Sequence, residues 1–332
     1  EIPKRDWSSD VCSSDLESMF NNNGDDNVAV GKWAMRLSTT ADQTVGIGAS
    51  ALSGNNATGT TGVGYRALYS NSTGINLSGV GHLVMDENTT GSNNTAMGSS
   101  ALYYNRTGSG NTSLGSYALH GFTGTSHSNN TGVGYNSLFA VRTGSANTAL
   151  GGGTLYALTT GASNTAIGYA AGDNITTGSN NITIGSEIDA VSATGNNQLN
   201  IGNVIYGDLS GGNIGIGDSS PAALFTVGSG DLFRVDSNGN VVRINNVAYS
   251  WPGAQGGADT YLRNDGSGNL TWVAVAGSSA TPTLQEVTDE GNITGNAIGV
   301  AGVSSTGNIL PTATLTYDLG SSSNRWKDVW AS

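Results

Sequence analysis

The chain has 332 residues, of which 51 are glycine, only 5 are proline and 11% are charged, and its net charge is −12. This composition excludes collagen and a highly charged disordered chain, and a total of 12 Lys and Arg argues against a nucleic-acid-binding protein. No stretch approaches the roughly 18 continuous apolar residues of a membrane span, so no membrane segment is expected.

The first stretch of the chain differs from the rest. Residues 6–16 read DWSSDVCSSDL and resemble the conceptual translation of a sequencing adapter. We therefore expect residues 1–16 to be an artefact that lies outside the fold, and residues 17–26 to be a disordered lead-in. Cys12 is the single cysteine, so an intrachain disulfide is excluded.

A repeat of about 17 residues follows, and we expect it to occupy residues 27–218. A glycine preceded by an apolar residue recurs in steps of mostly 17 residues at Gly31, Gly48, Gly64, Gly81, Gly98, Gly115, Gly134, Gly151, Gly168, Gly185, Gly202 and Gly217. Frequent glycines and short runs of alternating polarity favour short strands and tight turns over helices. A repeat this short cannot enclose a core, so successive repeats must stack. The sequence predicts an all-β fold, a β-roll or β-solenoid of about twelve coils.

Three positions of the repeat are expected to form columns along the stack. The apolar residue before the anchor glycine and the Met or Leu four residues after it are expected to be buried, and the anchor glycines to occupy corners that require positive φ or close packing. The asparagine four residues before the anchor is expected to form a hydrogen-bonded ladder. In the central repeats these residues are Met97, Leu114, Val133, Leu150, Ile167 and Ile184 before the glycine, and Asn94, Asn111, Asn130, Asn147, Asn164 and Asn181 in the ladder.

The period stops after Gly217. Apolar and polar residues alternate over residues 231–244 on either side of Asn238-Gly239, which is a strong signal for a β-hairpin. Residues 258–272 follow a similar pattern. We expect residues 219–275 to form a stalk of strands and hairpins, and residues 276–332 to form a separate C-terminal motif.

Two segments resemble known families. The phrase NTAIGYAAG at residues 164–172 resembles the head repeats of trimeric autotransporter adhesins, left-handed β-rolls that associate in threes, and it also occurs in phage tail fibres. Residues 310–332, above all YDLGSSSNRW at 317–326, resemble the motif that precedes the self-cleaving chaperone of phage tail fibres and tailspikes. The resemblance implies a parallel homotrimer in a virion, followed by a chaperone domain that this sequence does not contain.

Three functions agree with this pattern. The preferred one is a phage or prophage tail-fibre segment that attaches to a host-surface glycan or protein through multivalent, non-catalytic contacts. The alternatives are a bacterial surface adhesin that binds host matrix or neighbouring cells, and a glycan-cleaving tailspike. No catalytic constellation surrounds the three histidines, His82, His120 and His127, and no cofactor or metal is expected.

Tyrosines on the repeat are candidates for a binding surface. Tyr65, Tyr117, Tyr135 and Tyr169 follow the anchor glycines, and aromatic rings suit the apolar faces of sugars. The interpretation that we favour is packing of the same rings between protomers.

Overall fold

The fold was obtained as a computed structural model, which describes residues 11–12, 17–245, 247–258 and 260–275. Regular structure in these residues consists of β-strands with no helix, so the predicted all-β class is confirmed. The chain divides into two units, one of residues 1–255 with 262–271, and the other of residues 256–261 with 272–332. Strands β1 to β18 belong to the first unit.

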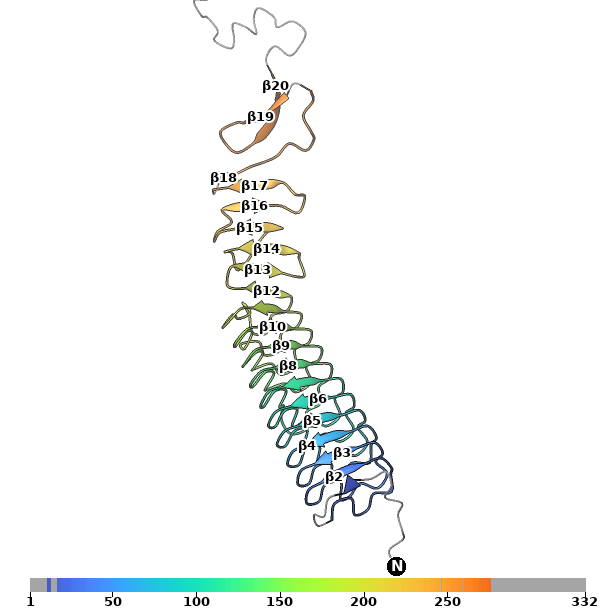
Figure 1. The fold of residues 1–332 in the computed structure, drawn as a ribbon. Coiled ribbons are helices and arrows are strands. Elements are labelled where there is room, and N and C mark those ends of the chain that lie inside the picture. Colours follow the sequence, from blue (N-terminus) through green and yellow to red (C-terminus); the bar gives the residue numbers. More distant parts are fainter. Residues whose placement is uncertain (1–10, 13–16, 246, 259, 276–332) are drawn as a thin grey trace, which may run out of the picture. The chain divides into compact units, whose positions relative to one another are not determined.

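The repeat forms a parallel β-solenoid in which each coil contributes one short strand (Figure 1). The coil strands are β2 (Val28–Val30), β3 (Val45–Ile47), β4 (Thr61–Val63), β5 (Ser78–Val80), β6 (Thr95–Met97), β7 (Thr112–Leu114), β8 (Thr131–Val133), β9 (Thr148–Leu150), β10 (Thr165–Ile167), β11 (Ile182–Ile184) and β12 (Gln198–Ile201). Equivalent residues pair across coils: Thr148 pairs with Thr165, and Thr165 with Ile182. The chain therefore advances by one strand spacing, about 4.8 Å, for each repeat.

In the interior of the coils a column of large side chains packs against small residues of the sheet. The Met or Leu four residues after the anchor glycine is fully buried, as predicted, at Met35, Leu52, Leu68, Met85, Leu102, Leu119, Leu138 and Leu155. From β2 to β10 the central residue of each strand points toward this column and is Gly, Ala or Ser, as at Ala96, Gly132 and Ala149. A Cβ on Gly62 would lie 2.9 Å from Cγ of Leu52, so the sheet and the column are in close contact and leave room only for small residues.

The anchor glycines turn the chain where neighbouring coils come closest. Gly98 has a φ of +134°, which side chains rarely adopt, and a Cβ there would lie 2.5 Å from the carbonyl oxygen of Gly115. The predicted role of the glycines is confirmed for the coils. The same close approach to the next coil recurs at Gly115, Gly134, Gly151 and Gly168, and Gly185 has a similar φ.

The predicted asparagine ladder is present in the core. Oδ1 of Asn147 accepts hydrogen bonds from both N and Nδ2 of Asn164, each at 3.0 Å, and Nδ2 of Asn164 also donates to the Gly178 carbonyl at 2.9 Å. Asn181 continues the ladder by donating from its N to Oδ1 of Asn164. Equivalent bonds connect Asn94, Asn111, Asn130 and Asn147. The buried amides thus link each coil to the next.

The number of coils differs from the prediction. The solenoid makes about ten turns rather than twelve, because the sheet becomes antiparallel after β12. Gly202 and Gly217 have φ near +65°, and a Cβ added to either would meet no atom within 4 Å, unlike at the corner glycines of the coils. They lie in turns beside β13 (Ile205–Asp208) and β14 (Asn213–Ile216), where no loop returns to form a coil.

Strands continue beyond the coils. β14 pairs in parallel with β15 (Phe225–Val227), and antiparallel pairing then joins β16 (Phe233–Val235), β17 (Val241–Ile244) and β18 (Val247–Ala248). The turn at residues 236–240 connects β16 and β17, which confirms the predicted hairpin. β19 (Thr260–Asn264) and β20 (Leu270–Ala274) form a second, two-stranded sheet.

The start of the described chain differs from the expected lead-in. Met19 is buried, and its N–H donates to the Ala34 carbonyl, so residues 17–26 pack on the first coil instead of being disordered. β1 (Val11–Cys12), within the stretch that resembles an adapter, pairs in parallel with β2. The C-terminal motif at 276–332 lies outside the described residues.

Candidate binding surfaces of the solenoid

The apolar residue before each anchor glycine points outward, which corrects the prediction that it is buried. In this single chain 55% of Met97 and 37% of Ile167 is exposed. The reason is the alternation of side chains along a strand: the central residue faces the interior, so both of its neighbours face out. We call the outward set the aliphatic column; it comprises Val30, Ile47, Val63, Val80, Met97, Leu114, Val133, Leu150, Ile167 and Ile184.

The aliphatic column runs along the outer face of the parallel sheet without a charged residue. Each of its members is exposed or half-buried in the isolated chain. The other outward position of the strands is mostly threonine or serine, as at Ser78, Thr95 and Thr165. A contiguous apolar strip of this kind is typical of a surface that another protein covers.

The four candidate tyrosines do not form a single site. Tyr135 and Tyr169 are about 60% exposed but lie two coils apart, with Gly152 between them in the repeat. Tyr117 contacts Tyr135 edge-on, with ring centroids 6.3 Å apart, whereas Tyr65 stacks on His82 at 5.4 Å, several coils away. The structure therefore brings together one pair and separates the others.

A different set of rings forms a continuous stack that was not predicted. Tyr103, His120, Phe139 and Tyr156, which we call the ring stack, come from four successive coils, and neighbouring centroids are 5.1–5.5 Å apart with planes within 19° of parallel. Burial lowers the pKa of His120, which favours its neutral form in the stack. In the sequence, the ring stack can be recognised by an aromatic residue five positions after each of four consecutive anchor glycines. Because the rings cover one another's faces, the stack stabilises coil packing more than it offers faces to a ligand.

A half-buried ion pair between Arg66 and Asp86 lies where the ring stack ends. Asp86 occupies the equivalent position one coil before Tyr103, is fully buried, and accepts hydrogen bonds from Nε and Nη2 of Arg66 at 3.0 and 2.9 Å. Burial raises the pKa of Asp86, and Arg66 opposes that shift. The guanidinium of Arg66 also lies over the Tyr69 ring at 4.3 Å. Such a bidentate pair fixes the position of both side chains between coils.

One coil carries two extra residues and a buried histidine. The step from Gly115 to Gly134 is 19 residues, and it contains His127, which is 1% exposed. Neither ring nitrogen makes a hydrogen bond of ordinary geometry, although the Leu119 backbone lies close enough to interact with the ring. Burial lowers the pKa of His127 to about 4. Phe122, in the same insertion, is exposed and lies beneath the Arg142 guanidinium at 5.3 Å.

His127 lies between coils that differ in the residues buried at one interior corner: asparagines before it and aliphatic residues after it. Buried asparagines occupy this corner in earlier coils, and Nδ2 of Asn88 donates to Oδ1 of Asn71 there. The N–H of His127 donates to Oδ1 of Asn105, the last asparagine of that series, at 3.0 Å. Later coils place Val141, Leu158 and Ile175 at the same position, and all three are fully buried.

The described part of the chain offers no metal centre of the usual kind. No group of three or more His, Cys, Asp or Glu side chains is arranged there to hold a metal ion. A helix long and apolar enough to cross a membrane was not found in the same residues.

Comparison with known proteins gives no relative for this chain. Neither protein-family profiles, nor curated proteins, nor solved structures match it.

Proposed function

We propose that this protein is a segment of a phage or prophage tail fibre, part of a virion, in which three parallel copies form a rigid spacer and attach to a host-surface glycan or protein. The contacts are multivalent and non-catalytic. The observation that carries the proposal is the aliphatic column, because it supplies a face through which identical chains can associate along the whole solenoid.

The pitch of the aliphatic column favours a copy of the same chain as the partner. One apolar side chain recurs with every coil, so a partner that covers the column must present a matching group about every 4.8 Å. A second solenoid in parallel orientation has this pitch. Closed cyclic symmetry then leaves every column covered, and three copies are the number that the resemblance to trimeric adhesin heads implies.

Covering the aliphatic column would contribute enough free energy to promote association. Covering a half-exposed Val, Ile, Leu or Met contributes roughly 1 kcal/mol, and the column provides such a residue in each coil from β2 to β11. The summed contribution is comparable with the cost of association, which is about 4–15 kcal/mol. Long, matching columns are therefore needed, and a short repeat array would associate weakly.

The choice of a tail fibre over a bacterial adhesin depends on the C-terminal motif. Residues 317–326 resemble the motif of phage fibres and tailspikes, and they lie outside the described residues. Neighbouring genes distinguish the two: capsid and baseplate genes support the tail fibre, and a membrane-anchor domain supports the adhesin.

Light scattering of the purified protein tests the association. The chain has a mass of 33.5 kDa, so we expect three times that value, about 100 kDa. The double variant Met97→Glu with Leu150→Glu places charges on the aliphatic column and should yield folded monomers, as circular dichroism would verify. Thr160→Glu, on an exposed turn, is the matched control and should leave the mass unchanged. A wild-type mass of one chain would refute the proposal.

A further inference from the structure

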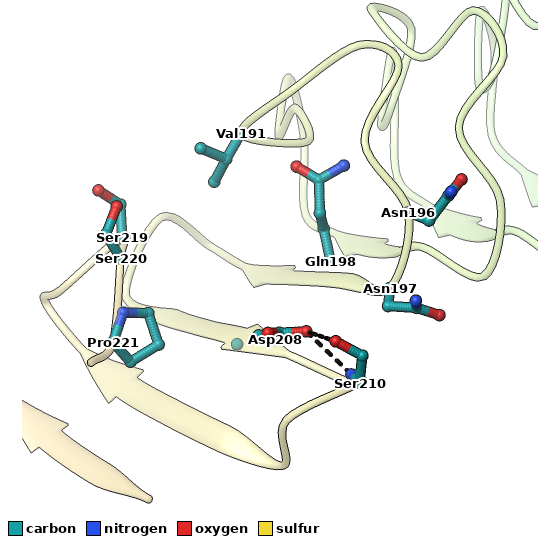
Figure 2. Close-up of a pocket in the computed structure, with 10 residues that line it drawn as sticks. Val191, Asn196, Asn197, Gln198, Asp208, Ser210, Ser219, Ser220 and Pro221 are labelled. Atoms are coloured by element: carbon teal, nitrogen blue, oxygen red, sulfur yellow. Dashed lines mark hydrogen bonds between the residues drawn. The ribbon is translucent and has the colours of Figure 1, made fainter. Parts of the chain in front are cut away.

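A pocket opens where the coils end. After β11 the sheet continues through β12, β13 and β14, but the loop half of the coil does not return. The result is a cavity of about 470 Å³ over β12 and β13, bounded on one side by Val191 and Asn196–Asn197 and on the other by Ser219–Pro221 (Figure 2). This volume lies within the range of small-molecule sites in proteins.

The pocket contains the continuation of the asparagine ladder. Oδ1 of Asn181 accepts hydrogen bonds from N and Nε2 of Gln198, at 2.8 and 3.2 Å. Gln198 pairs directly with Asp208 across the antiparallel strands, and Asp208 pairs with Asn213. Side chains of directly paired residues lie on the same face of a sheet. The hydrogen-bonded ladder ends at Gln198, and strand pairing places the Asp208 carboxylate next to it on the same face.

Asp208 differs from the ladder positions in the coils because no loop covers it. In the coils each ladder amide also donates to a backbone carbonyl of the covering loop, as Asn181 does to Gly195 at 2.9 Å and Asn111 to His127 at 2.8 Å. Asp208 instead accepts hydrogen bonds from N and Oγ of Ser210 and remains exposed to the pocket (Figure 2). These hydrogen bonds lower the pKa of Asp208, so the carboxylate is charged at neutral pH.

The lining indicates the class of ligand. Besides Asp208, the lining includes Asn196, Asn197, Ser219 and Ser220, which carry amide and hydroxyl groups, while Val191 and Pro221 add apolar surface. None of the residues that line the pocket is a Lys, Arg or His, so a negatively charged ligand would meet an unbalanced carboxylate. A neutral ligand with several hydroxyls and some C–H surface can use all of these groups.

We propose that this pocket binds a neutral saccharide residue, with Asp208 accepting hydrogen bonds from its hydroxyls and the amides and serines donating to or accepting from the others. Weak binding of this kind becomes effective when several copies of the pocket act together. The proposal deepens the attachment function above by naming the ligand class and its site. It does not require the trimer.

Saturation-transfer NMR with the full chain tests the proposal. The neutral probes are the methyl glycosides of glucose, galactose, mannose and N-acetylglucosamine, and the anionic probes are glucuronic acid and N-acetylneuraminic acid. We expect transfer to at least one neutral probe and to neither anionic one. Asp208→Asn should weaken binding by about tenfold or more, as expected for loss of a charged hydrogen-bond acceptor.

Matched variants separate binding from folding. Asp236→Asn is the control, because Asp236 is a half-buried turn carboxylate that accepts from Asn238 N at 2.9 Å, as Asp208 does from Ser210 N, but lies outside the pocket. It should bind as the wild type does. The pair Ser219→Ala with Ser220→Ala should also weaken binding while leaving the Asp208 turn intact.

Three outcomes would overturn the proposal: no neutral probe bound by the wild type, equal binding by the pocket variants, or preferential binding of the anionic probes. The probes are soluble and monovalent, so these results do not depend on association. If no saccharide binds but light scattering gives the mass of three chains, the binding-site proposal is wrong and the fibre proposal is unaffected.

Discussion

At Gly98 the chain passes within contact distance of the next coil while its backbone adopts a φ of +134°. Two requirements coincide there, since a Cβ would strain the backbone and also collide with Gly115. The repetition of glycine at this corner is therefore a steric necessity of the stack. The colliding atoms belong to backbone, so no side-chain rotation can relieve the clash.

We predict that Gly98→Ala lowers the free energy of unfolding by roughly 3 kcal/mol or more, because overpacking and backbone strain add. Thermal or denaturant unfolding followed by circular dichroism measures the loss. Gly253→Ala is the control, since a Cβ there meets no atom within 4 Å and the backbone is outside the left-handed region. Equal stability of the two variants would contradict the close packing of the corners.

His127 is an ionisable group that the fold keeps neutral. Its pKa falls to about 4 from an ordinary value of 6.5, because burial disfavours the imidazolium. Above pH 6.5 the histidine is neutral in both the folded and the unfolded chain and has no effect on stability. Between pH 6.5 and 4 the unfolded chain binds a proton that the folded chain does not, so stability falls over this interval.

We expect the free energy of unfolding to decrease by up to roughly 3 kcal/mol from this group between pH 7 and pH 4, as the difference of the two pKa values implies. Denaturant unfolding at a series of pH values measures it. His127→Phe should reduce the pH dependence, and the control His82→Phe, at an exposed position, should retain it. An unchanged profile for His127→Phe would show that the histidine is not the group responsible.

At the scale of the coil, the asparagine ladder links repeats through buried polar groups. Asn147 accepts from Asn164 and donates from N and Nδ2 to Oδ1 of Asn130, so its side chain serves the coils on both sides. Hydrogen bonds that are buried and fully paired cost little, whereas an unpaired partner costs about 1–3 kcal/mol. Ladder positions should therefore tolerate substitution less well than exposed turn positions.

Asn147→Ala is predicted to lower the free energy of unfolding by roughly 3 kcal/mol, because it leaves N and Nδ2 of Asn164 without their shared acceptor. Unfolding in denaturant at pH 7 measures the effect. Ser163→Ala is the matched control: Ser163 is exposed, and Ala146 already occupies the same position of the preceding coil. A loss no larger than that of the control would contradict a stabilising ladder.

The sequence predicted those features of the coil that follow from the constant repeat length alone. A spacing of 17 residues is enough to pair Thr148 with Thr165 and to align Asn147 with Asn164, because equivalent atoms are related by one shift. It did not reveal which strand residue faces inward. In a strand of three residues, hydrophobicity predicts that the large aliphatic residue is the buried one. The space beside the Leu column, however, admits only a small residue such as Ala149.

The end of the solenoid was also mispredicted for a physical reason. Gly202 and Gly217 follow isoleucine as the other anchors follow an apolar residue, but the chain after them places no large, fully buried side chain such as Ile175 in a loop half. Without that side chain no coil can close, and the chain turns back into antiparallel strands. The same missing loop creates the pocket around Asp208, which no repeat pattern indicates.

At the scale of the whole molecule, the proposed fibre requires that further copies of the chain cover the aliphatic column. Its residues alternate with inward-facing residues along the coil strands, so their exposure in a single chain is a direct result of the stack. Solvent exposure of such a column would be costly along its entire length. Association between solenoids of equal pitch removes that cost.

A cryo-electron microscopy reconstruction of the purified protein is the most direct test of the trimeric fibre. We predict a three-fold symmetric particle in which coils rise by about 4.8 Å and the aliphatic columns of three chains meet around the axis. Density for a solitary solenoid, with Met97 and Leu150 facing solvent, would contradict association through the column.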